Sequence, residues 1–415
     1  MKFQLAQNSW AGEAPVEIRL PESWHVEYLS GRNDTLPPLT KGQLMERLAA
    51  PIGSPSLYQL AQGKREVCLL IDDTSRGTPA QPVAEAVLEI LLSAGVPKGG
   101  IRFLNACGAH APMNASDFRQ KLGWDIVREY PTYNHNPYEH CRRIGETSAG
   151  IPVELNQEFL DCDLRIGIGS LVPHPVNGFG GGGKIVMPGV ASIQTIRGTH
   201  FDAIKATIDS GINPVRESGN LEASRVFRQQ IDEIVSMSGF EFKIDCAVSS
   251  RKEIVDLFAG APASAYYAGC AAAKDLYTVS PSTPYDVVIA NANFKGSEAT
   301  IGASTAALAL DPHRGGDLVV VNHVPFGQVV HYGSSAFGKD FGGFMWFGLG
   351  KKPKGVRRMI LYTPYQEWSS AAFYCDPALI TWASTWDEVE RLLKDHGPGT
   401  RCGVFADATI QTLRQ

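Results

Sequence analysis

Several features that mark out whole classes of protein are missing from this sequence. None of its 415 residues lies in a run of 18 apolar residues, which a membrane-spanning helix would need. No apolar stretch follows the lysine near residue 1, so we expect no signal peptide. The formal net charge is −5, so we expect no basic face for nucleic acid or for an anionic membrane.

Paired cysteines are also missing. The eight cysteines are scattered and none forms a C-x-x-C motif. This spacing predicts reduced, mostly buried thiols in a cytoplasmic protein. There is no internal repeat and no low-complexity segment apart from one glycine run.

The length and the order of apolar runs predict a two-domain α/β protein. A chain of 415 residues is too long for one typical core. Strand-like and helix-like runs alternate twice, which is typical of mainly parallel sheets. We expect a first domain over residues 1–270 and a second over 271–415, with about the last 20 residues returning to the first. We expect the active site in the interdomain cleft.

The clearest pattern begins near residue 66. "REVCLLI" reads as a strand, "AQPVAEAVLEILLSAGV" as a helix and "GIRFLNAC" as the next strand. Polar turns at Asp72–Pro79 and Gly108–Pro112 follow the two strands. Because ligands gather at the carboxyl ends of parallel strands, we expect both turns in one site.

The residues in these turns suggest specific roles. Ser75 and the loop amides suit a phosphate, and Arg76 suits bidentate binding of a carboxylate. His110 suits a general base, because its ordinary pKa is near neutrality. The alternative for the first turn, around Asp73 and Thr74, is a plain Asx-type turn.

A second candidate is the glycine-rich stretch "PHPVNGFGGGGKIVMPG", Pro173–Gly189. Gly178–Lys184 matches the first seven positions of a phosphate-binding loop, but Ile185 replaces the Ser or Thr that would bind Mg²⁺. "IVMPG" reads as extended chain and a turn. Three interpretations remain: a nucleotide triphosphatase, a flexible loop, or an open channel that exposes Lys184 for covalent attachment.

Two histidines bracket this lysine. His174 lies between two prolines, and His200 ends "TIRGTH". Imidazole binds nickel, zinc, copper and iron, but no cysteine or carboxylate lies at a local metal-site spacing here. A metal would therefore have to bring other ligands with it.

These segments together resemble the nickel-pincer-nucleotide-dependent lactate racemase family. The resemblance rests on "DTSRGTP", on "GAHAP" and on the long ordered motif "HPVNGFGGGGKIVMPG…TIRGTH". It covers nearly the whole chain, is strongest over 66–200 and is weakest after 290.

The resemblance implies a cofactor and roles for named residues. The cofactor would be a nickel-pincer nucleotide, a pyridinium-3-thioamide-5-thiocarboxylate mononucleotide joined covalently to Lys184 and supplied by cofactor-biosynthesis enzymes. His200 would bind the nickel, and His110 and His174 would be the acid/base pair. The phosphate would lie near four residues of the first turn and three glycines: Asp73, Thr74, Ser75, Arg76, Gly180, Gly181 and Gly182.

The sequence departs from the family pattern where lactate would bind. Ala111 replaces an arginine, and Asn291–Ser304 lacks the expected glutamine and lysine. Lys295 and Glu298 are the polar residues left there, as substrate contacts or as solvated surface. Trp346 either shapes a larger pocket or belongs to the core.

We therefore predict an isomerase that racemises or epimerises C2 of a small-molecule 2-hydroxy acid other than lactate, with Arg76 among its substrate contacts. Proton-coupled hydride transfer would avoid forming a dianion. One alternative is a lactate racemase with rearranged contacts. Another is a nucleotide-binding or sensor module without turnover, although such a module would need no acid/base pair.

Overall fold

The computed structural model describes residues 1–7, 12, 14–211, 213–333, 350–368 and 371–414. The chain forms two compact units. Unit 1 comprises Met1–Thr35, Asp275–Val329 and Phe347–Gln415, and unit 2 comprises Leu36–Lys274 and Val330–Trp346. Residues 1–35, expected in the domain over 1–270, and the last 20 residues, expected to return to it, both lie in unit 1 with residues 275–329.

Unit 2 is built on a six-stranded sheet in the order β13-β12-β9-β4-β5-β6. All neighbouring pairs are parallel except β12 and β13. The strands are β4 (Val67–Ile71), β5 (Ile101–Asn105), β6 (Thr132–Asn134), β9 (Leu164–Ser170), β12 (Phe242–Val248) and β13 (Ile254–Gly260).

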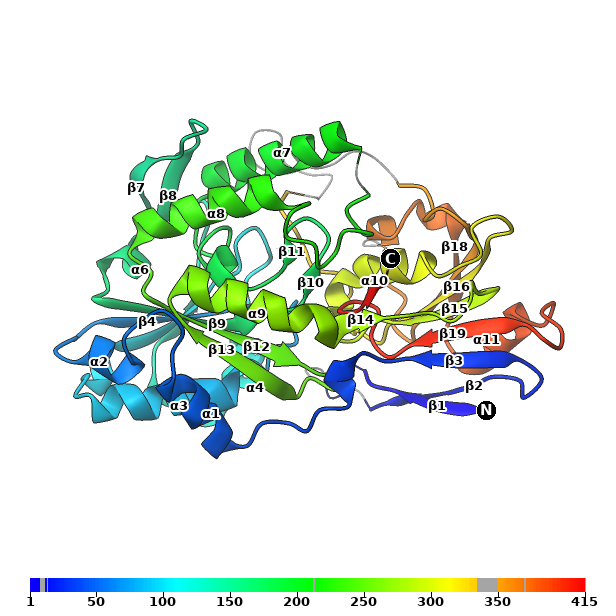
Figure 1. The fold of residues 1–415 in the computed structure, drawn as a ribbon, viewed down its shortest axis with the longest axis horizontal. Helices are drawn as coiled ribbons and strands as arrows, with labels where there is room; N and C mark the ends of the chain where they lie inside the picture. The colour runs from blue at the N-terminus through cyan, green and yellow to red at the C-terminus, as the bar shows by residue number, and fades with distance from the viewer. Residues whose placement is uncertain (8–11, 13, 212, 334–349, 369–370, 415) are drawn as a thin grey trace. The chain divides into compact units, whose positions relative to one another are not determined.

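The other elements of unit 2 surround this sheet, with α7 and α8 on one side and α1 and α3 on the other (Figure 1). The helices are α1 (Lys41–Ala49), α2 (Leu57–Ala61), α3 (Ala80–Ser93), η3 (Lys98–Gly100), α4 (Ala115–Leu122), α5 (Trp124–Glu129), α6 (Gln157–Asp161), η4 (Gly182–Ile185), α7 (Ile193–Ser210), α8 (Arg225–Ser238) and α9 (Pro262–Tyr277). Two short hairpins complete it: β7 (Cys141–Glu146) with β8 (Pro152–Asn156), and β10 (Pro173–His174) with β11 (Gly178–Phe179).

Buried apolar runs explain why these segments form the core. Every residue of β4 is buried, as expected for a strand covered on both faces. Helix α3 buries Val83, Val87 and Leu91, which recur at helical spacing. Helix α8 contributes Phe227, Ile231 and Ile234 to the core that also contains Leu70 of β4.

The strand order changes direction between β4 and β9. From β4 the chain proceeds outward through β5 and β6, whereas β9 and β12 lie on the other side. Ligands bind at the carboxyl ends of the strands that flank such a switch point. The segments that leave β4 and β9 here are Asp72–Pro79 and the one leading to Lys184.

Unit 1 contains a second six-stranded sheet in the order β18-β17-β16-β15-β19-β3, with every neighbouring pair parallel. The strands are β3 (His25–Leu29), β15 (Val287–Asn291), β16 (Gly316–Val321), β17 (Val356–Tyr362), β18 (Ile380–Ala383) and β19 (Arg401–Phe405). The remaining elements are β1 (Lys2–Leu5), β2 (Val16–Arg19), η2 (Arg32–Asp34), β14 (Thr278–Val279), η5 (Gly296–Glu298), α10 (Ala299–Ala307), η6 (Ala371–Phe373), η7 (Pro377–Leu379), α11 (Trp386–Leu392) and β20 (Thr412–Leu413).

The two chain ends meet in this sheet. Strand β3 pairs with β19 along its whole length, from His25 opposite Arg401 to Leu29 opposite Phe405. In Figure 1 the blue β3 accordingly lies beside the red β19. This pairing explains why the first 35 residues belong to unit 1. The switch point of this sheet lies between β15 and β19.

Other expectations from the sequence have clear outcomes. All eight cysteines lie in described segments and none forms a disulfide; only Cys141 is not fully buried. No described helix is both long enough and apolar enough to cross a membrane. One local prediction was wrong in part: Ile185–Gly189 was expected as extended chain and a turn, but Ile185 ends a 3-10 helix and residues 186–189 form turns.

Candidate active site

A buried lysine stabilises the turn after β4. Lys121 of α4 is fully buried and pairs with Asp72 at 2.6 Å. Its ammonium also donates to the carbonyl oxygens of Asp73 (3.1 Å) and Arg76 (2.9 Å). Thr78 donates to the other Asp72 oxygen at 2.6 Å. These bonds fix the backbone of the turn.

The same turn carries an aspartate–histidine pair. Asp73 Oδ1 accepts from the Ser75 amide at 2.7 Å, which is the expected Asx-type turn. Its Oδ2 lies 2.8 Å from His110 Nδ1. The structure therefore brings the two polar turns together, as expected. Arg76 adds a hydrogen bond from Nη1 to Ser75 Oγ at 3.0 Å.

This contact sets the charge and the tautomer of the pair. Burial would raise the pKa of Asp73, but the charge and hydrogen bond of His110, then Arg76 and Ser75, hold that pKa well below its ordinary value. An ionised carboxylate accepts a hydrogen bond from Nδ1–H, so Nε2 is the nitrogen of neutral His110 that can take up a proton. The arrangement matches a general base oriented by a carboxylate.

The turn after β5 is joined to the glycine-rich stretch. Gly108 donates its amide to the Gly189 carbonyl at 2.9 Å. Its φ of +55° favours glycine, and a Cβ there would lie 3.1 Å from the Pro188 carbonyl oxygen. The segment that contains Lys184 is therefore anchored to the segment that contains His110.

The glycines have a different use from the open channel that we expected. A Cβ on Gly181 would lie 2.5 Å from an Asp245 oxygen, and one on Gly182 would lie 2.6 Å from the ring of Tyr266. The Gly182 amide donates to Asp245 at 2.9 Å, and Asp245 is paired with the equally buried Lys243 at 2.6 Å. The glycines allow close packing against β12 and α9, and the Gly182 amide is already bonded to protein.

Three other amides of Gly178–Lys184 also donate to carbonyl oxygens of the protein. Phe179 donates to Asn177 at 2.7 Å, Gly180 to Val172 at 2.8 Å and Lys184 to Gly181 at 3.3 Å. A phosphate-binding loop needs such amides directed at the phosphate. This geometry counts against a nucleotide triphosphatase.

Lys184 lies beside His174. Its Nζ is 3.2 Å from His174 Nε2, while His174 Nδ1 accepts from the Val176 amide at 3.1 Å. Because Nδ1 is held by this amide, Nε2 is the His174 nitrogen that faces Lys184.

His200 has the properties of a metal ligand. Its Nδ1 lies 3.0 Å from the Ile196 carbonyl oxygen, so Nδ1 carries the proton and the Nε2 lone pair is the one available to a metal. Burial, and then the charges of Lys184 and His110, lower the pKa of His200 to about 3, against the opposing effect of the Ile196 bond. The imidazole therefore stays neutral, as a metal ligand must.

The residues expected to contact substrate in unit 1 lie beside its own switch point. Lys295 follows β15, is fully buried, and donates its amide to Thr409 Oγ1 at 3.1 Å. Complete burial excludes a solvated surface role for Lys295. Glu298 is partly buried. Trp346 lies outside the described residues.

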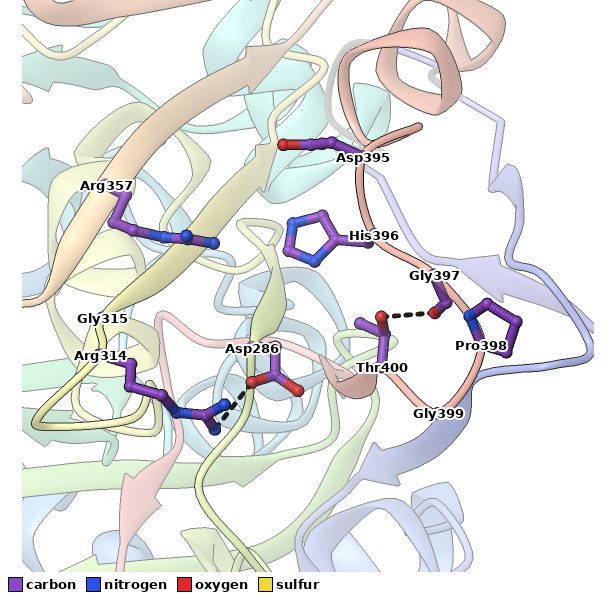
Figure 2. A pocket seen from close by; sticks show the side chains of 10 residues that line it. All are labelled: Asp286, Arg314, Gly315, Arg357, Asp395, His396, Gly397, Pro398, Gly399 and Thr400. Atoms are coloured by element: carbon purple, nitrogen blue, oxygen red, sulfur yellow. Dashed lines mark hydrogen bonds and ion pairs between the residues drawn. The ribbon is translucent and has the colours of Figure 1, made fainter.

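Unit 1 contains a pocket with a volume of about 340 Å³, which is a competing candidate for the active site. Figure 2 shows Asp395, His396, Arg357 and Arg314 around it. Within the described ranges, the one group of three potential metal-binding side chains is here: Asp317, Asp395 and His396, with donor atoms within 4.8 Å of one another.

Two observations count against this pocket as an active site. It is lined by residues such as Asp286, Gly315 and Thr400, which come just before strands, so it lies at the amino ends. The Arg358 guanidinium pairs with Asp317 and Asp395, so a cation is already in place between the carboxylates.

Sequence reasoning missed three residues of the site. Lys121 and Lys243 appear in the sequence as ordinary lysines of a helix and a strand, and only the topology shows that both are buried. His331 lies far along the chain, yet its ring is 5.1 Å from that of His110. No local motif surrounds it, so only the fold reveals its position.

Comparisons with known proteins point to one kind of enzyme. Residues 11–211 match the model of the lactate racemase N-terminal domain. A lactate racemase of Thermoanaerobacterium thermosaccharolyticum is 26% identical over 76% of this chain and 70% of its own length. A lactate racemase of Lactiplantibacillus plantarum is 30% identical over 60% of this chain, which spans 58% of that relative.

Solved structures extend the likeness to the whole fold. The lactate racemase apoprotein of T. thermosaccharolyticum matches over 100% of both chains with a TM-score of 0.73 and 20% identity. A protein from Thermotoga maritima matches over 93% of this chain and 100% of its own, with a TM-score of 0.67 and 18% identity. The chain thus has the α/β fold of the lactate racemase apoprotein. Residues 11–211 are similar to the lactate racemase N-terminal domain, and both curated relatives are lactate racemases.

Proposed function

We propose that this protein is an isomerase that racemises or epimerises C2 of a 2-hydroxy acid other than lactate. The observation that carries the proposal is the pair of oriented histidines: His110 beside Asp73 at 2.8 Å, and His174 beside Lys184 at 3.2 Å. Inversion at C2 of a hydroxy acid needs one proton acceptor for each enantiomer, and this site has two imidazoles.

The residues present fit the nickel-pincer nucleotide at two points. Lys184 would form the covalent link, because its Nζ lies 3.2 Å from His174 Nε2, beside one of the two proposed acid/base groups. His200 would bind the nickel through Nε2, because its Nδ1 is held by the Ile196 carbonyl. When bound, the nucleotide supplies the hydride acceptor that the protein itself lacks. Cofactor-biosynthesis enzymes are therefore partners in this proposal.

Fewer residues are proposed to contact the cofactor phosphate than the sequence suggested. Thr74, Ser75 and Arg76 remain candidates for phosphate contact. The ionised Asp73 would hold their turn in place through its bond from the Ser75 amide. Gly181 and Gly182 would shape the loop that carries Lys184, because their Cβ positions are filled by protein.

The protein's own groups would move the proton. His110 would take the hydroxyl proton of one enantiomer through Nε2, with Asp73 stabilising the resulting imidazolium. His174 would do the same for the other enantiomer. Arg76 would hold the substrate carboxylate, because a guanidinium binds it bidentately.

The substrate assignment rests on what surrounds these groups. Ala111 offers no charge beside His110, so a second carboxylate contact has to come from elsewhere. We assign it to Lys295, with Glu298 nearby in sequence. The reduced thiols suit a cytoplasmic location.

A panel of chiral 2-hydroxy acids tests this function. Protein made together with the cofactor-synthesis enzymes is incubated with one enantiomer each of lactate, malate, phenyllactate and a sugar acid. We expect loss of optical purity with at least one acid other than lactate. Fastest turnover of lactate would favour a lactate racemase with rearranged contacts, and no turnover of any acid would contradict the proposal.

A further inference from the structure

The short segment Val330–Gly333 docks directly onto the His110 turn within unit 2. Ala111 donates its amide to the Val330 carbonyl at 3.0 Å, and Tyr332 donates to the Ala109 carbonyl at 2.8 Å. These two bonds flank an antiparallel bridge that pairs His110 with His331. Residues in such a pair point their side chains to the same face at close range.

The ring geometry confirms this closeness. The centroids of His110 and His331 are 5.1 Å apart and the planes are inclined at 61°. Asp73 and Ser75 both contact Nδ1 of His110, at 2.8 and 3.3 Å. His331 therefore borders the same imidazole that carries the proposed proton transfer. Tyr332 secures the segment through an edge contact with Tyr138, with centroids 5.5 Å apart.

Hydrogen bonding defines which ring nitrogen of His331 can donate. Its Nδ1 accepts from the Gly333 amide at 3.1 Å, so neutral His331 carries its proton on Nε2. Burial, and then the charges of His110, His200 and Arg76, lower the pKa of His331 well below its ordinary value. The side chain is thus a neutral donor that lies within electrostatic reach of three residues of the site.

We propose that His331 contacts the substrate through its Nε2–H and helps determine which 2-hydroxy acid is accepted. A neutral donor suits a carboxylate or hydroxyl oxygen and does not compete for the proton that His110 takes. Ala111 makes no such contact, because its side chain is a methyl group and its amide is bonded to Val330. This inference rests on the proposed function and deepens it.

Two substitutions separate a donor role from a packing role. His331→Phe keeps an aromatic ring against His110 but removes the donor, whereas His331→Gln keeps an N–H donor and removes the ring. We expect KM for the best acid of the panel to rise at least tenfold in His331→Phe, with kcat changed less than threefold and with the wild-type pH profile. His331→Gln should restore KM to within threefold of wild type.

A matched control and a second readout keep the test independent of turnover. Val330→Ala, at an exposed neighbouring position, should leave KM unchanged. Nitrogen NMR of the imidazoles should show His331 neutral with the proton on Nε2 between pH 6 and 8. A protonated His331, or a His331→Phe enzyme with wild-type KM, would overturn the inference.

The two proposals fail in different ways. If wild type turns over no acid of the panel, the proposed function fails. Titration calorimetry with the same acids then still tests His331, because binding needs no turnover. Equal affinities of wild type and His331→Phe for every acid, including no measurable binding by either, would contradict the role of His331 alone.

Discussion

In unit 2 the loops after β4, β5 and β9 carry Asp73, His110 and Lys184, whereas in unit 1 the loops after β15 and β19 carry Lys295 and Asp407. Both sets lie at the carboxyl edge of a mainly parallel six-stranded sheet, close to its switch point. The sheets are alike, but the loops use their polar groups differently.

In unit 1 the polar groups are used mainly on one another. Asp407 accepts from the Phe294 amide and from Thr409 Oγ1, both at 2.6 Å, and burial raises its pKa to about 6 against these bonds. Asn322 and Gln328 both donate to the Gly296 carbonyl, at 2.8 and 3.1 Å. This edge is a rigid framework that holds Lys295.

In unit 2 one set of polar groups supports the backbone of the loops, and a different set is available for chemistry. Lys121 and the Lys243–Asp245 pair hold the backbone, and the imidazoles and Lys184 are only partly buried. The comparison shows that a switch point provides a place for chemistry. A loop at such a point can act on a ligand only when its titratable groups are not already bonded to one another.

The largest expected effect is loss of an imidazole from unit 2. His110→Ala or His174→Ala should lower racemisation by roughly 10²–10⁴-fold, the usual contribution of a positioned acid or base. Chiral chromatography of the reaction measures it, and intact mass should show that the cofactor adduct is unchanged. His313→Ala, at an exposed histidine of unit 1, is the control. Full activity in either site variant would disprove the acid/base assignment.

The carboxylate that orients His110 should matter less. Asp73→Asn should lower kcat by roughly 10–100-fold, as for other partners that orient a functional imidazole. The neutral amide cannot stabilise the imidazolium, although it keeps the shape of the side chain. Asp125→Asn, at an exposed acid of α5, should have no effect. Equal rates for Asp73→Asn and wild type would show that the pair is only structural.

Substrate contacts from unit 1 should appear in KM. Lys295→Met should raise KM about tenfold or more, because a hydrogen bond to a charged group contributes about 1.5–3 kcal/mol. Glu298→Gln should change KM less, since this side chain is partly exposed. Steady-state kinetics with matched thermal melts separate binding from unfolding. A lower melting temperature for Lys295→Met with KM unaltered would make Lys295 part of the unit 1 framework only.

The smallest effect concerns a histidine of unit 2 outside the site. His135 is buried and its ring nitrogens contact the Ala191 carbonyl (2.9 Å) and Asn156 (3.2 Å). Burial lowers its pKa to about 4, against the Ala191 bond. The folded protein then binds this proton less tightly than the unfolded chain, so stability falls as pH drops from about 6.5 to about 4.

Urea unfolding at several pH values measures this slope. The contribution of His135 is at most about 3 kcal/mol for a shift of this size. His135→Gln should flatten the slope within that window. An unchanged slope would assign the acid sensitivity to other groups.

The sequence predicted local elements correctly, but it did not predict contacts between residues far apart in the chain. The strand and helix around Asp72–Pro79 were predictable because apolar spacing and turn residues are local signals. The pairing of β3 with β19 was not, because it joins residues nearly 380 positions apart, such as His25 and Arg401. The glycine run was misread for the same reason: its neighbours, Asp245 and Tyr266, are defined by the fold.

The site itself was predictable only as far as its motifs reached. His110, His174, Lys184 and His200 belong to short ordered motifs and could be proposed from them. His331 stands alone in sequence, and it reaches the site through two backbone bonds to Ala109 and Ala111.

The most direct test of the central claim is the mass and nickel content of the protein itself, purified after production with the cofactor-synthesis enzymes. The account predicts one covalent adduct on Lys184 and bound nickel in wild type, and neither in Lys184→Arg. His200→Gln should keep the adduct and lose nickel. A wild-type protein with no added mass, or a Lys184→Arg protein that still carries the adduct, would contradict the account.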